Sequence, residues 1–166
     1  MKEIWTKLQN VLNEMLEFYQ TLLAVSRKKR AVLVSGKARE LEAVTKEEEI
    51  LILQAGKLES RREKIIVEIA VGYGLNTEEI TFAKIKELAD ETDAAQLEQL
   101  AKSLEAVVAE IKQLNQVNTK LIQQSLRFIQ YNINILTQNT SGPTYEPQGK
   151  TTEQTGQGRN LFDRKA

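Results

Sequence analysis

The amino-acid sequence predicts an all-α protein: an elongated antiparallel bundle of three long helices plus one short helix, with a disordered C-terminal tail. Two observations support this prediction. Apolar residues recur every three or four positions over residues 1–138, which is the spacing of helices that bury one face. Both prolines and four of the eight glycines fall in residues 139–166, where this pattern stops. We therefore expect a helical bundle domain over 1–138 and a polar tail with short docking motifs over 139–166.

The first helix is predicted by a seam of apolar residues whose spacing alternates between four and three. Large side chains on both flanks widen this seam, which indicates contact with two neighbouring helices. Ser35 and Gly36 then interrupt the pattern, and glycine favours the end of a helix. The seam consists of Ile4, Leu8, Val11, Met15, Phe18, Leu22 and Val25, flanked by Trp5, Leu12, Leu16, Tyr19 and Leu23.

The second helix is predicted over residues 37–71, again from a seam of apolar positions. Two charged residues, Glu48 and Arg62, stand in line with that seam. Two interpretations are open. In the first, their side chains extend outward at the edge of the seam, as long charged side chains often do. In the second, they make a polar contact that sets the register with a neighbouring helix.

Two capping signals predict the remaining helices. Asn76 can cap a short helix that ends near residue 89, and Glu79 stands three residues later, as a capping box requires. Asp93 offers a second cap, with Gln96 at the capping-box position, for a last helix that runs to about residue 138. Short connections between these segments favour antiparallel neighbours.

Composition excludes several classes of function. Lys+Arg and Asp+Glu number 23 each, so no excess charge favours nucleic acid or an anionic membrane. The chain has no cysteine and no histidine, which excludes disulfides, thiolate metal sites and the usual nucleophilic triads. The N-terminal residues are amphipathic and carry Glu3 and Glu14, unlike a signal peptide, and no apolar run reaches membrane-spanning length. We expect a cytosolic protein that is not an enzyme and uses no metal or cofactor.

Two runs of like charge are interpreted as solvent-exposed. The basic run Arg27-Lys28-Lys29-Arg30 falls near the end of the first helix, where cations suit the helix dipole. It lacks interleaved aromatic residues, so a solvated face is favoured over a nucleic-acid patch. The acidic run over residues 47–49 has no second acidic cluster with which to form a metal site, and is interpreted in the same way.

The last helix carries small polar residues at core-like positions. Asn118, Ser125 and Asn132 recur every seven residues. This pattern is consistent with a seam tuned for packing inside the bundle, where polar residues fix the register. It is also consistent with a helix whose C-terminal half extends past the bundle and offers an apolar groove to a partner helix. The apolar residues of this face are Leu121, Ile122, Phe128, Ile129, Ile135 and Leu136.

Several segments, taken in order, resemble one known family. The first helix contains LQNVLNEMLEFYQTLLAVSRKKRAVLVSG, the second contains EEEILILQAGKLESRRE, and the last contains LNQVNTKLIQQSLRFIQYNINIL, the most specific of the three. A Tyr-x-x-x-Gly step from Tyr145 to Gly149 follows, and the chain ends in LFDRKA. Over almost its whole length the chain resembles the FlgN-type flagellar export chaperones, and its final residues are similar to those of Gram-positive-type members.

The resemblance implies a function. Members of the family bind hook-associated junction proteins (FlgK and FlgL type) in the cytosol, hold their C-terminal amphipathic region and prevent premature assembly. They then deliver these clients to the flagellar export gate (FlhA type), so the chain would be cytoplasmic and transiently at the membrane-bound export apparatus. The resemblance implies no nucleic acid, membrane insertion or small-molecule substrate. It assigns the client to the last helix, at Leu114, Asn118, Leu121, Ile122, Ser125, Phe128, Ile129, Asn132, Ile135 and Leu136.

The tail would supply a second contact. By resemblance, the tail docks the chaperone to the gate through Tyr145. Leu161 and Phe162 form another isolated apolar group in the same polar segment. Isolated apolar anchors in a polar segment are typical of short linear motifs that order only on binding. We therefore expect all three residues to take part in docking.

Two other classes of function are compatible with the sequence. The heptad seams alone would also permit a self-associating coiled-coil module or adaptor without a secretion client. An enzyme built on a pair of carboxylates would be a third class, but no such pair stands out in the sequence.

Overall fold

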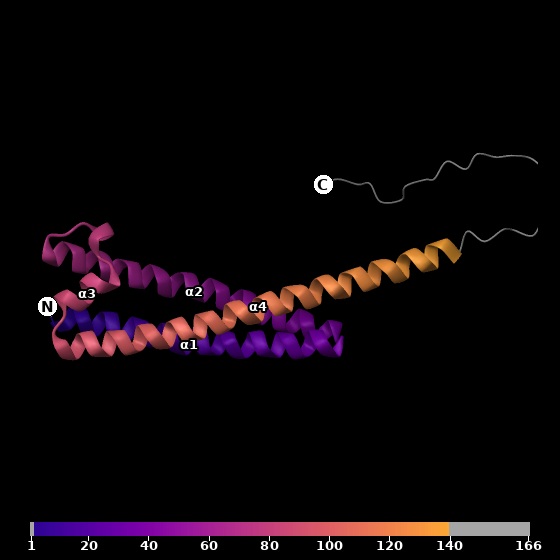
Figure 1. The fold of residues 1–166 in the computed structure, drawn as a ribbon, viewed down its shortest axis with the longest axis horizontal. Coiled ribbons are helices and arrows are strands. Elements are labelled where there is room, and N and C mark those ends of the chain that lie inside the picture. The colour runs from indigo at the N-terminus through magenta and orange to yellow at the C-terminus, as the bar shows by residue number, and fades with distance from the viewer. Residues whose placement is uncertain (1, 140–166) are drawn as a thin grey trace, which may run out of the picture. The chain divides into compact units, whose positions relative to one another are not determined.

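The computed structural model describes residues 2–139, and these form four α-helices and one 3₁₀ turn. The long helices are α1 (Lys2–Ser35), α2 (Ala38–Tyr73) and α4 (Glu91–Asn139), and the short one is α3 (Phe82–Leu88) (Figure 1). The chain divides into two compact units, Met1–Ile129 and Gln130–Ala166, and the described part of the second is the end of α4. The predicted all-α fold of three long helices and one short helix is confirmed. The predicted tail lies outside the described residues.

Within the first unit, α2 runs antiparallel to α1, and α4 runs parallel to α1 (Figure 1). Trp5 near the start of α1 packs in one cluster with Ile69 near the end of α2. Gln9 Nε2 at the start of α1 donates to Asp93 Oδ1 at the start of α4, over 2.8 Å. The short connections force these directions, as expected for a helical bundle.

Two apolar clusters hold the first unit together. The larger one lies where α1 begins and α2 ends, and it also takes in α3 and the start of α4. The smaller one lies where α1 ends and α2 begins, around Val25, Val32 and Val44. Both draw on the predicted seams, because a helix buries the stripe that recurs every three to four residues. The buried members of the larger cluster are Trp5, Leu8, Val11, Ile66, Ile69, Ile85 and Leu97.

Glycine ends α1, as predicted, and it also ends α2. Gly36 and Gly74 follow the two helices with φ of 69° and 64°, a left-handed conformation that costs glycine little. The backbone N–H of Leu75 donates to the carbonyl of Ala70 over 2.9 Å, which satisfies one of the terminal carbonyls of α2.

The starts of α3 and α4 differ from the prediction. Asn76 and Glu79 do form a hydrogen-bonded box, with the Asn76 N–H donating to Glu79 Oε2 over 2.7 Å, but they initiate only a 3₁₀ turn over Thr77–Glu79. Helix α3 begins later, where Thr81 Oγ1 accepts the N–H of Lys84. Two capping residues so close together gave sequence reasoning no basis for choosing between them.

Helix α4 starts earlier than Asp93. Asp90 precedes the helix, and its Oδ1 accepts the N–H of Asp93 over 2.9 Å, so Asp90 is the cap. The carboxylate of Asp93 is thereby available for Gln9 across the bundle. One aspartate therefore starts the helix and the other joins it to α1.

Most residues of the two charged runs are exposed, as predicted, but several of them also pair with residues on other helices. Lys28 and Lys29 of α1 pair with Glu47 and Glu48 of α2, and Arg27 pairs with Glu110 of α4. The basic run also ends several residues before the C-terminus of α1, so the helix dipole does not explain it. The antiparallel α1–α2 pair brings the two runs side by side.

Glu48 and Arg62 resolve differently. Glu48 of α2 makes an inter-helix ion pair with Lys29 of α1. Both side chains keep less than a fifth of their area exposed. Arg62 instead pairs with Glu59 of its own helix, and this hydrogen bond lowers the pKa of the Glu59 carboxyl. Of these two residues, Glu48 is therefore the one placed to fix the register of α2 against α1.

A further ion pair makes stability depend on pH. Arg61 of α2 donates two hydrogen bonds to Glu14 of α1, which lower the pKa of the Glu14 carboxyl below its ordinary value of 4.5. A carboxyl with a lowered folded-state pKa stabilises the fold above its unfolded pKa, and that contribution is lost as pH falls through the folded value. We expect Glu14→Gln to lower the thermal midpoint slightly near about pH 7, with the difference vanishing in acid.

Circular dichroism melts of both proteins at the two pH values check this expectation. The control is Glu49→Gln, an exposed acid on α2 for which the described residues show no ion pair. A difference between wild type and Glu14→Gln that persists in acid would contradict the assignment.

Candidate functional site

An apolar groove of about 650 Å³ lies in the first unit, between the α1–α2 turn and α4. We call it the apolar groove. One wall comes from the end of α1, the turn and the start of α2: Val32, Leu33, Gly36, Lys37, Ala38 and Leu41. The other wall comes from α4: Ile122, Gln124, Ser125, Leu126, Phe128 and Ile129. Most of these side chains are apolar, and Lys37 is the one charged residue among them.

Helix periodicity builds the α4 wall, and the turn at Gly36 builds the other. Ile122, Leu126 and Ile129 are spaced four and three apart, so they share one face of α4. On the other side, the left-handed Gly36 reverses the chain, so that Leu33 before the turn and Leu41 after it line the same groove. Leu126 and Ile129 keep 61% and 52% of their surface exposed. Contiguous exposed apolar surface of this kind marks sites of interaction.

The predicted client residues fall into three groups. Ile122, Ser125, Phe128 and Ile129 line the apolar groove. Leu114 and Leu121 are half-buried in the first unit, and Asn118 is buried. In the second unit, Ile135 and Leu136 are exposed and Asn132 is half-buried. Tyr145, Leu161 and Phe162 lie outside the described residues.

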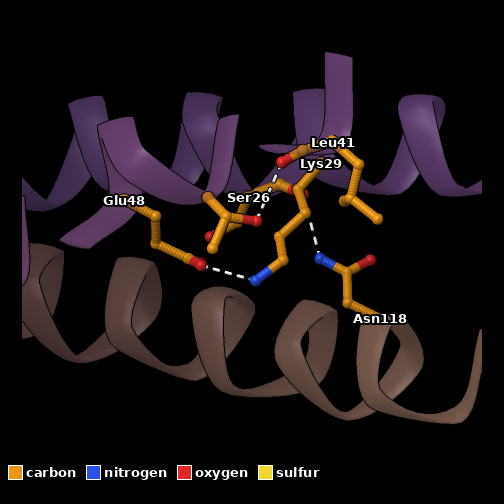
Figure 2. A network of polar contacts seen from close by, with 6 residues as sticks. Ser26, Lys29, Leu41, Glu48 and Asn118 are labelled. Atoms are coloured by element: carbon orange, nitrogen blue, oxygen red, sulfur yellow. Dashed lines mark hydrogen bonds and ion pairs between the residues drawn. The ribbon is translucent and has the colours of Figure 1, made fainter. Parts of the chain in front are cut away.

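Asn118 belongs to a polar cluster inside the bundle (Figure 2). It is 3% exposed, and its Nδ2 donates to the main-chain carbonyl of Ser26 on α1 over 3.1 Å. Nearby, Lys29 pairs with Glu48, and Thr45 Oγ1 donates to the carbonyl of Leu41 within α2. Asn118 therefore ties α4 to α1, as expected of a seam residue that sets register, and we do not propose it as a client contact.

Two buried atoms of the same cluster lower the stability of the fold. Neither Asn118 Oδ1 nor Ser26 Oγ has a hydrogen-bond partner among the described residues, although both atoms are buried. A buried polar atom left without a partner destabilises a fold by about 1–3 kcal/mol. The packing of α4 on α1 next to the apolar groove is thus specific in register but weakened.

Replacing both residues by apolar ones is expected to stabilise the protein. The double variant Ser26→Ala/Asn118→Leu removes both unsatisfied atoms and keeps similar volumes, so we expect a gain of about 1–2 kcal/mol in the free energy of unfolding. Chemical denaturation followed by circular dichroism measures it. The comparison is Ser103→Ala, which changes a half-buried serine elsewhere on α4. A double variant less stable than wild type would contradict the idea.

Sequence reasoning missed one wall of the apolar groove. Val32 continues the first seam seven residues after Val25, so the spacing contained that signal. Leu126 stands four residues after Ile122 and three before Ile129, so the spacing of α4 contained its signal as well. Leu33 and Leu41 gave no such signal for a site, because their contribution depends on the turn meeting α4.

The chemistry available in the groove is that of binding. Among residues 2–139, no three histidine, cysteine or acidic side chains gather closely enough to hold a metal ion. Over the same residues, no helix has both the length and the hydropathy needed to cross a bilayer. An apolar groove between helices suits the apolar face of an amphipathic partner helix.

Two comparisons with known proteins found a match. The family model described as FlgN protein matches residues 1–153. The chain is also similar to the uncharacterized protein YvyG of Bacillus subtilis strain 168. The two are 26% identical over 155 residues, which cover 93% of this chain and 94% of the relative. No solved structure matches.

Proposed function

The chain belongs to the FlgN family of flagellar export chaperones, and we propose that it binds the C-terminal amphipathic region of hook-associated junction proteins (FlgK and FlgL type). Bound in the cytoplasm, such a client could not assemble prematurely. The chaperone then delivers it to the export gate (FlhA type). Chaperones of this family bind flagellar substrate proteins and are not a family of enzymes.

The apolar groove is the observation that supports this proposal. It presents Ile122, Leu126 and Ile129 in a row along α4, opposite apolar side chains of the α1–α2 turn. An amphipathic helix places its own apolar residues at the same spacing, so it can fill such a groove. In the second unit, Ile135 and Leu136 are exposed, and we retain each of them as a proposed client contact in its own right.

Co-expression tests the proposal directly. The full chain is produced with an intact junction protein and, separately, with a version lacking its C-terminal helix. We expect a purified complex with the intact client only. If neither client forms a complex, or if both do equally, the proposal fails. Light scattering on the same samples tests the alternative of a self-associating coiled coil, which predicts a homodimer that persists when client is added.

The tail supplies the proposed gate contact. We predict that Tyr145→Ala weakens binding to the cytoplasmic domain of the export gate by about tenfold, as expected for one aromatic anchor of a linear motif. Client binding should be unchanged, because Tyr145 is neither a residue of the apolar groove nor one of the proposed client contacts on α4. Pull-down with the gate domain, with and without client, measures both. Phe162→Ala is expected to have a smaller effect in the same direction, and Thr151→Ala serves as the control. Loss of both activities together would contradict separate sites.

A further inference from the structure

Basic side chains dominate the charged residues around the apolar groove. After Glu110, the described part of α4 contains no acidic residue, while it carries Lys112, Lys120 and Arg127. Residues 18–39, which lead into the α1–α2 turn, also contain no acidic residue. The whole chain is neutral overall, so this distribution is a local property of the surface that carries the groove.

Cations gather along one wall of the groove. On α4, Lys120 and Arg127 stand two residues before Ile122 and Ile129, which is about 200° around the helix, so they lie on the face away from the groove. On the other wall, Lys37 lines the groove itself, and Arg30 stands three residues before Leu33 on the same face of α1.

Little local acid balances these charges. Among the residues that the structure describes, Arg30, Lys120 and Arg127 form no ion pair. Lys37 pairs only with the neighbouring Glu40 in an exposed contact, which is easily exchanged for another partner. Arg30 and Lys37 are exposed, so they can reach an incoming carboxylate.

From this arrangement we propose that the groove selects an amphipathic helix whose apolar stripe is flanked by aspartate or glutamate. The inference rests on the proposed function and specifies the client chemistry that it requires. The apolar stripe would fill the groove between α4 and the turn, and the carboxylates on the side that faces the turn would meet Lys37 and Arg30. Charges at the rim of an interface mainly set specificity and association rate.

The same charges disfavour a second copy of this chain as the occupant. The exposed segment of α4 that could enter a neighbouring groove has no acidic residue from 111 to 139. Pairing two such segments would therefore bring cations toward cations, which costs affinity. The chemistry of the groove fits an acidic partner better than it fits itself.

Three synthetic helical peptides test the selection against the full chain. They share leucine at the a and d positions of each heptad and carry glutamate, glutamine or lysine at e and g. We expect the glutamate peptide to bind about tenfold tighter than the glutamine peptide at low salt, and the lysine peptide to bind weakest. The preference should fade at high salt, because rim charges are screened. Equal binding of the three peptides would overturn the proposal.

A charge-reversed chain supplies the matched variant. Arg30→Glu/Lys37→Glu should invert the order of the glutamate and lysine peptides. Lys57→Glu/Lys64→Glu changes total charge equally on an exposed part of α2 outside the groove, and should leave the order unchanged. Equal effects of both pairs would mean that only total charge matters, and would overturn the proposal. Circular dichroism confirms that each variant folds.

An intact junction protein separates the two proposals. If it binds wild type and the Arg30→Glu/Lys37→Glu chain equally well, the charge selection is wrong while the chaperone function stands. If no junction protein binds wild type although the peptides bind in the expected order, the groove chemistry stands and the proposed client is wrong.

Discussion

Replacing Leu126 and Ile129 together by serine is expected to weaken client binding by about 100-fold or more. Both side chains line the apolar groove and are more than half exposed in the isolated chain, so a bound helix would bury them. Burying one such side chain contributes about 1.5–3 kcal/mol, and each 1.4 kcal/mol is a factor of ten in affinity. The fold should survive, since neither residue belongs to the two buried clusters. Isothermal titration with the client's C-terminal region measures the loss.

The control is a chemically matched pair on another helix. Ile52 and Leu53 of α2 are 58% and 73% exposed and lie outside the groove, so Ile52→Ser/Leu53→Ser removes similar apolar area from a helix surface. Any general effect of serine on helix stability should be similar in the two variants. We expect client binding to change less than about threefold in the control. A comparable loss in both variants would move the client site away from the apolar groove.

The helices could be predicted from sequence because their signal is local and long. A stripe that recurs every three to four residues over thirty or more positions leaves little room for another structure, and glycine marks the ends of α1 and α2. The starts of α3 and α4 were harder. Two residues able to cap stand close together near each start, and the choice between Asp90 and Asp93 depends on whether Asp93 is drawn toward Gln9 across the bundle.

Pairing between helices was beyond the sequence alone. The basic run of α1 and the acidic run of α2 each looked like a solvated face, and they become partners only because the turn at Gly36 folds α2 back along α1. The candidate site shows the same limit. Its α4 wall follows from the spacing of Ile122 and Ile129, whereas Leu33 and Leu41 join it through contacts between distant segments.

Trp5→Ala is expected to lower the free energy of unfolding by about 3–5 kcal/mol, as large-to-small substitutions in a packed core do. Trp5 is 3% exposed and packs in the cluster that joins α1 to α2, α3 and α4. Its ring centroid lies 6.1 Å from that of Tyr73, whose hydroxyl donates to the carbonyl of Leu88 at the end of α3. Since a domain of this size has only about 5–15 kcal/mol of stability in total, the loss should be easily measured.

The measurement must use circular dichroism with denaturant, because Trp5 is the only tryptophan and its removal abolishes tryptophan fluorescence. Trp5→Phe keeps an aromatic ring and should lose clearly less, while Val71→Ala, at a highly exposed position on α2, should change stability by less than about 0.5 kcal/mol. The α2 partner of Trp5, Ile69, is about 42 Å along that helix from Leu41 in the groove, at 1.5 Å per residue. Client affinity of the still-folded Trp5→Ala chain should therefore match wild type. A stability loss below about 1 kcal/mol would show that this cluster is not the main core of the bundle.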